Sequence, residues 1–162
     1  MSSKSRDTTP KLEEFRLQAR SDFGFLCRDF GFHEVPLPLD QDPYLNEYAV
    51  WFASPTTRVV VEGVNYGINA RVAVGRSGKV ATFENYDLGD LLAIRRPEPA
   101  GPPSKASPRN SGNQLQQLSY YAEALRDAAS DVLRGDHAIF PQLAARVERR
   151  RAEFAARRDP RA

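Results

Sequence analysis

The sequence has little of what most catalytic and metal-binding sites need. Its 162 residues include one cysteine and two histidines. A lone cysteine excludes an intramolecular disulfide and a zinc site built from cysteines. His33 and His137 lie far apart in the chain, and neither belongs to a pattern typical of a catalytic pair or a metal site. We therefore predict no catalytic residue, no metal and no cofactor.

Long hydrophobic runs are also absent. No segment approaches the roughly 20 apolar residues of a membrane span, and the first residues, MSSKSRDTTPKLEEF, lack the apolar core of a signal peptide. These absences predict a cytoplasmic protein without membrane contact. Apolar residues make up 41% of the chain and charged residues 27%, which is typical of a globular domain with its own core.

The glycines do not form a phosphate-binding motif. The segment GRSGK, residues 75–79, lacks the spacing of a P-loop and joins two predicted strands. We interpret it as a hairpin turn.

The N-terminal part of the chain predicts a helix. Apolar residues recur every three or four positions between 11 and 30, and Gly31 follows as a left-handed cap. Gly24 permits a bend within this helix. Cys27 is interpreted as a small buried hydrophobe, since no cationic partner that would activate a thiol is evident.

The middle of the chain has the period of two that is typical of β-strands. Pro36 and Pro38 place the first of these strands at a sheet edge, because proline donates no ladder hydrogen bond. The pattern predicts an antiparallel meander of four or five strands with one covered face. The predicted strands lie in 32–39, in a hairpin over 47–64, in 68–75 and in 80–85.

The remaining segments complete a predicted α+β fold. Asp87 caps a short helix, a flexible proline-rich insert follows, and two C-terminal helices pack on one face of the sheet. We predict a disordered N-terminus over 1–10, a single domain over 11–157 with the insert at 97–113, and a frayed end over 158–162. Alternatively, 114–157 forms a separate helical hairpin that serves oligomerisation.

Nine residues are expected to form the centre of the core, because they lie on the apolar faces of the predicted helices and strands. They are Phe15, Phe23, Phe30, Val50, Phe52, Val72, Leu118, Leu125 and Leu133. The last predicted helix has a core-facing stripe of its own, made of Phe140, Leu143, Ala144, Val147 and Phe154.

An acidic and aromatic segment, DQDPYLNEYAVWF, precedes the hairpin. Asp40, Asp42 and Glu47 give it a charge of −3 without a compensating base. With Tyr44 and Trp51 they form the predicted partner-binding site, since aromatic side chains supply contact energy and charges steer a basic partner. This hypothesis requires exposed carboxylates without structural contacts. The alternative is an ordinary solvated loop.

The charge distribution raises a second hypothesis. Residues 1–100 carry a net charge of −2 and residues 101–162 a net charge of +4. Guanidinium groups bind phosphates, so a nucleic-acid-binding helix is the alternative function. Its candidate residues are Arg146, Arg149, Arg150 and Arg151. Acidic residues interrupt this run, and a solvated helix face explains it as well.

A third hypothesis is an enzyme whose site is assembled from residues that no spacing reveals. Glu47, Glu62, His33 and Arg71 are the candidates for such a site.

Three segments together resemble a known group of proteins: FGFHEV after the first helix, the hairpin NEYAVWFASPTTRVVVE, and the late helix LSYYAEALRDAASDVLRGD. This layout is similar to that of small bacterial α+β immunity proteins of polymorphic toxin systems. The resemblance implies a non-enzymatic inhibitor or adaptor that binds a cognate protein, such as a toxin domain with a basic surface. It implies no catalytic residues and leaves the oligomeric state open.

Overall fold

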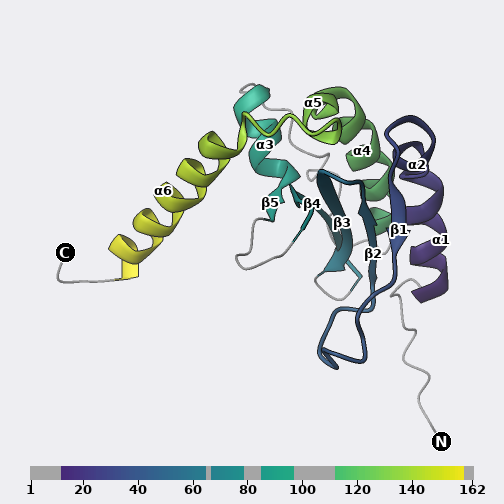
Figure 1. The fold of residues 1–162 in the computed structure, drawn as a ribbon. Helices are drawn as coiled ribbons and strands as arrows, with labels where there is room; N and C mark the ends of the chain where they lie inside the picture. The colour runs from purple at the N-terminus through teal and green to yellow at the C-terminus, as the bar shows by residue number, and fades with distance from the viewer. Residues whose placement is uncertain (1–11, 65–66, 79–84, 97–111, 159–162) are drawn as a thin grey trace, which may run out of the picture.

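The computed structural model describes residues 12–64, 67–78, 85–96 and 112–158. It confirms the α+β class, with helices before and after a five-stranded antiparallel sheet of order β1-β2-β3-β4-β5 (Figure 1). In chain order the elements are α1 (Leu12–Asp22), α2 (Phe25–Asp29), β1 (His33–Val35), β2 (Ala49–Ala53), β3 (Thr57–Val64), β4 (Asn69–Arg76), β5 (Tyr86–Asp87), α3 (Leu88–Arg95), α4 (Gly112–Ala128), α5 (Ser130–Leu133) and α6 (Phe140–Arg158). None of the helices in these described ranges is both long and apolar enough to cross a membrane.

The sheet directs alternate side chains toward two different environments. The rows Val50–Val61–Val72 and Phe52–Val59–Val74 run across β2, β3 and β4 and belong to the hydrophobic core. The alternate row, Trp51–Val60–Ala73, points to the opposite face because side chains alternate along a strand. Val60 and Ala73 are buried there, but they lie apart from the core cluster.

Helices α1 and α4 cover the core face of the sheet. They contact each other and lie together on one side of it (Figure 1). The core prediction is confirmed for eight of its nine residues, which are buried in one cluster. Phe30 is the exception: it is only partly buried, and the guanidinium of Arg134 lies 5.3 Å from its ring centroid.

The predicted N-terminal helix is divided in two at Gly24. The break turns the following residues relative to α1, so Phe25 and Leu26 face the core in α2. Cys27 is consequently exposed, and its interpretation as a buried hydrophobe was wrong. Gly31 has φ 73°, which confirms the predicted left-handed cap.

Several predictions fall on residues that the structure does not describe. The N-terminal tail over 1–10, nearly all of the 97–113 insert and most of the strand expected over 80–85 lie outside the described ranges. The described strand in that region is β5. Its last residue, Asp87, accepts a hydrogen bond from the backbone N–H of Gly89 at 2.8 Å, so the predicted cap of α3 is confirmed.

Two glutamines attach α4 to the first residues of β4. The side chain of Gln117 accepts a hydrogen bond from the N–H of Ala70 at 2.8 Å, and Gln114 donates to the carbonyl of Asn69 at 2.9 Å. Gly63 makes room for this contact, because a Cβ at that position would lie 2.6 Å from Nε2 of Gln114. Polar side chains therefore fix the position of α4 along β4, in addition to apolar packing.

Helix α6 leaves the rest of the molecule after its first turns. Phe140 and Leu143 are buried, whereas every residue from 148 to 158 is exposed, including Phe154 at 59%. The expectation that Phe154 faces the core was therefore wrong. Figure 1 shows α6 extending away from the side of the molecule that contains α3 and β5, with which it makes its main contacts.

A buried threonine joins the β2–β3 turn to the segment that precedes α6. The hydroxyl of Thr57 lies 2.9 Å from the carbonyl oxygen of Val132 and 2.9 Å from Nε2 of His137. A hydroxyl has one proton, and Thr57 donates it to the carbonyl, so Nε2 of His137 carries the proton in the second contact. No pattern in the sequence indicates this pairing across 80 residues.

Replacing Thr57 by valine should destabilise the protein by about 1–3 kcal/mol, because the shape is kept while the buried carbonyl of Val132 and the half-buried ring of His137 lose their hydrogen bonds. Urea unfolding measures the change. Thr56→Val makes the same substitution at the exposed neighbouring position. It removes a hydroxyl 3.2 Å from that of Thr57 but leaves the Val132 carbonyl and His137 their contacts with Thr57, so its cost should be clearly smaller. Equal losses in both variants would contradict the assignment.

Candidate protein-interaction surface

The segment between β1 and β2 presents the predicted acidic site to solvent. Asp40, Asp42 and Glu47 are exposed, and Tyr44 is 94% exposed. Within the described residues, the carboxylates of Asp40 and Glu47 take part in no hydrogen bond or ion pair. We call residues 40–47 the acidic loop.

One carboxylate of the acidic loop has a structural role that the sequence analysis did not expect. Asp42 accepts a hydrogen bond from the backbone N–H of Tyr44 at 3.0 Å, which is the geometry of an Asx turn. This bond orders the backbone that carries the exposed tyrosine. Asp42 therefore combines a local conformational role with its charge.

The C-terminal end of the acidic loop is attached to the domain by groups other than its carboxylates. Asn46 donates to the carbonyl of Gly63 at 2.8 Å and accepts from the N–H of Tyr48 at 3.0 Å. Arg16 of α1 donates to the backbone carbonyl of Glu47 at 3.1 Å. Because these bonds use an amide and a backbone carbonyl, the acidic side chains stay available while the loop is held.

Trp51 lies beside the base of the loop and not within it. It is partly buried on the sheet face opposite the core, and it lines a hollow of about 190 Å³ together with Leu37 and Leu39. Its indole Nε1 is buried without a hydrogen-bond partner. The structure thus places Trp51 next to the start of the acidic segment, but its accessible area is smaller than that of Tyr44.

The arginines of the nucleic-acid hypothesis are partly engaged in the fold. Asp90 of α3, only 5% exposed, accepts hydrogen bonds from Arg146 at 3.0 Å and from Arg150 at 2.9 and 2.7 Å. Arg151 pairs with Glu148 at 3.2 Å, and Arg149 is exposed. Two of the four candidates therefore anchor α6 to α3.

The Asp90 cluster is electrostatically favourable despite its burial. Burial on its own would raise the pKa of Asp90, but hydrogen bonds and attraction from Arg150 and Arg146 outweigh it and hold this pKa below its usual value. A signal for this contact was present in the sequence. Arg146 and Arg150 are four residues apart on one helix face, and Asp90 lies among the leucines of LGDLL.

Two residues of the enzyme hypothesis are neighbours in the sheet, since Glu62 of β3 and Arg71 of β4 are cross-strand partners, but His33 lies apart from them. His33 pairs with Ala53 at one end of β2, whereas Glu62 pairs with the residue at the other end of that strand. Arg71 forms an ion pair with Asp87 at 3.1 Å, and Glu47 lies in the acidic loop. Among the described residues, no group of three or more histidines, cysteines or carboxylates could hold a metal ion.

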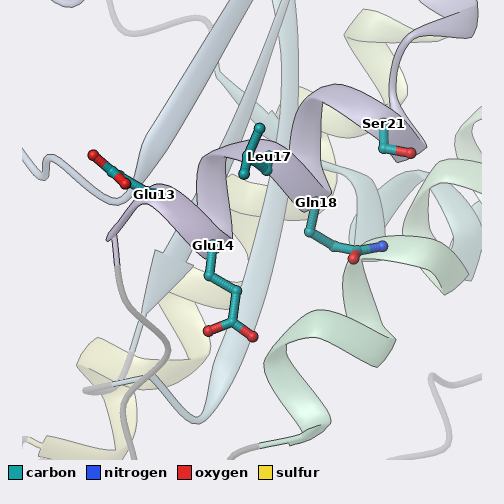
Figure 2. A pocket seen from close by; sticks show the side chains of 5 residues that line it. All are labelled: Glu13, Glu14, Leu17, Gln18 and Ser21. Carbon is teal, nitrogen blue, oxygen red and sulfur yellow. The ribbon is translucent and has the colours of Figure 1, made fainter.

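A second surface hollow lies on α1, with a volume of about 420 Å³. It is lined by Glu13, Glu14, Leu17, Gln18 and Ser21, which all come from this one helix (Figure 2). Figure 2 shows these side chains spreading outward from the ribbon and not converging on a point. This geometry provides no set of groups that could act on one ligand.

No protein-family model matches the chain, and neither a curated protein nor a solved structure matches it. The resemblance to immunity proteins is therefore still a hypothesis, and function is inferred from the exposure, charge and contacts of the described residues.

Proposed function

We propose that this protein is a non-catalytic protein-binding module that recognises a basic surface on a partner through the acidic loop. The supporting observation is the combination of a tyrosine 94% exposed with carboxylates that form no ion pair with the described residues. Tyrosine supplies a large contact area at low entropic cost, and negative charge accelerates the encounter with a basic surface. In this proposal the protein acts in the cytoplasm.

The biological role that we propose is that of an immunity-type inhibitor or a small adaptor. An inhibitor of a toxin needs a fixed, charged surface, because pre-organisation lowers the cost of binding. The hydrogen bonds of Asn46 and Arg16 at the end of the acidic loop are consistent with that requirement. The partner that fits best is a basic domain, such as a toxin domain that acts on nucleic acid.

Changing Asp40 and Glu47 together to lysine should leave folding intact and impair partner binding. Both side chains are exposed, so the melting temperature should stay within about two degrees of the parent. Association with the basic partner should slow several-fold and lose its acceleration at low salt, since steering acts mainly on the on-rate. Surface plasmon resonance over a range of salt concentrations measures both effects.

A matched variant controls for the change in net charge. Glu123 and Asp127 are exposed on α4, so changing both to lysine alters the charge equally at a different surface. The partner is identified as a protein captured by the parent and by this control but lost with the loop variant. Equal binding of that protein by all three would contradict the proposal.

Two further variants separate charge from contact within the loop. Asp42→Asn keeps the acceptor for the Tyr44 N–H and removes the charge, so it should slow association only. Tyr44→Ala should instead accelerate dissociation, because an aromatic anchor contributes to the bound state.

A further inference from the structure

Apart from Arg150, which binds Asp90, the last three turns of α6 are not buried against any other described part of the chain. Each residue from 148 to 158 is exposed, and we call this segment the distal helix. A helix of this length is marginal in water without tertiary packing. Phe154 is 59% exposed, which leaves much of a large apolar ring in solvent. Contact with another surface would therefore bury the ring of Phe154 and stabilise the distal helix.

One face of the distal helix is both apolar and basic. Val147, Arg151, Phe154 and Arg158 follow one another at spacings of four, three and four residues, so they lie on the same side of the helix. The guanidinium of Arg158 is 5.0 Å from the ring centroid of Phe154. A surface that complements this face must offer carboxylates together with an aromatic group.

The acidic loop offers that combination on the same molecule. Its three exposed carboxylates lie at positions 40, 42 and 47, on both sides of the exposed Tyr44 in the chain. Within one chain the two surfaces lie apart. The loop joins β1 and β2 at one edge of the sheet, whereas α6 contacts β5 at the other edge and extends away from it (Figure 1). Pairing of the two surfaces therefore requires two molecules.

We infer that the distal helix of one copy docks on the acidic loop of a second copy. This inference rests on the proposed function, because it names an occupant for the same loop. Arg151 and Arg158 pair with the loop carboxylates, and Phe154 packs against Tyr44. If both copies exchange helices, the assembly closes as a two-fold dimer.

Two other occupants of the distal helix are less favoured by the same observations. Two distal helices paired with each other would bring five arginines and two glutamates from each copy together, and like charges repel. A nucleic acid would use a continuous set of free arginines. Arg150 is already bound to the buried Asp90, and Glu148 and Glu153 interrupt the other arginines of the distal helix.

Sedimentation equilibrium of the full chain tests the inference. The parent should pass from the monomer mass of 18.1 kDa to a dimer as its concentration rises, and salt should weaken this association. Arg151→Glu/Arg158→Glu and Asp40→Lys/Glu47→Lys should each weaken it by about tenfold or more. An equimolar mixture of the two variants should dimerise again, because its helix and loop charges are once more opposite. Melting temperatures close to the parent show that both variants fold.

Two single variants, Arg158→Glu and its control Arg149→Glu, separate the position of the charge from its amount. The control makes the same change in charge on the same helix but outside the face that carries Phe154, so it should weaken association less. A parent that stays monomeric at every concentration would overturn the inference, as would a variant mixture that fails to associate. The proposed function is judged separately, by the effect of the loop variant on a foreign partner. Oligonucleotide binding by a monomeric parent, lost only in the helix variant, would also overturn the inference and would favour nucleic acid as the occupant.

Discussion

Replacing both Arg146 and Arg150 by methionine should destabilise the protein by about 3 kcal/mol, because it leaves the carboxylate of Asp90 buried without a cation. Asp90 is 5% exposed, and among the described residues these two arginines donate the side-chain hydrogen bonds that it accepts. The side chains of Arg146 and Arg150 are 41% and 60% exposed, so the loss of stability comes mainly from the buried carboxylate that no longer has a cation beside it. Equilibrium unfolding in urea at neutral pH measures it.

Two variants show whether the buried charge is the cause. Arg149→Met/Arg151→Met removes the same number of arginines from exposed positions, so it should change stability by no more than about 0.5 kcal/mol. Adding Asp90→Leu to the destabilised double variant should restore most of the stability, since an apolar group replaces the charge that lost its partners. If the two double variants lose the same amount, the Asp90 cluster has no special role.

The pH dependence of this loss has a defined sign. In the folded parent the pKa of Asp90 is held below its ordinary value, so the cluster contributes its full stability above the unfolded-state pKa of about 3.9. That contribution decreases as the pH falls through the folded-state pKa, because the carboxyl then binds a proton. The difference in stability between the parent and the double variant should therefore be large at neutral pH and should shrink in acid.

The local patterns of the sequence predicted the sheet and most of the core. Alternation such as that of Val72 and Val74 follows directly from the geometry of a strand with one covered face, and Gly31 supplies the positive φ that a helix end requires. These features depend on residues that are close in the chain, so they can be predicted from a single sequence. The break at Gly24 shows the limit: the sequence permitted a bend, but the direction in which Cys27 turned depends on packing.

Contacts between distant segments could not be predicted in the same way. Thr57 with His137, and Asp90 with Arg146 and Arg150, depend on how the helices are placed against the sheet. Phe154 illustrates a related limit. Periodicity shows that it shares a helix face with Phe140, but it does not show where the domain that covers this face ends.

For the acidic loop, the sequence analysis predicted that the three carboxylates and Tyr44 are exposed, and the structure shows all four exposed. The local bond from Asp42 was missed, although Asp42 stands two residues before the N–H that it binds, which is the spacing of an Asx turn. The partial burial of Trp51 beside Leu37 and Leu39 depends on how the loop leaves β1. That path is a tertiary feature.

Phe52→Ala should cost about 3–5 kcal/mol of unfolding free energy, which is a large effect for a single substitution. The ring is 2% exposed and lies in the core row of β2, where Val59 is its cross-strand partner. Removing it deletes buried apolar area and leaves a cavity that the flanking strands can only partly fill. Urea unfolding of parent and variant should show a lower midpoint with an unchanged slope.

Phe154→Ala deletes the same atoms from the distal helix and is the control for this prediction. Its ring is 59% exposed and has no cavity to leave, so the unfolding free energy of the monomer should change by less than about 0.5 kcal/mol. At concentrations where the parent dimerises, the same variant should associate about tenfold more weakly, since it loses the apolar contact with Tyr44. A Phe52→Ala midpoint equal to that of the parent would mean that the faces of β2 are misassigned. A Phe154→Ala monomer destabilised as much as Phe52→Ala would mean that the distal helix packs within its own chain.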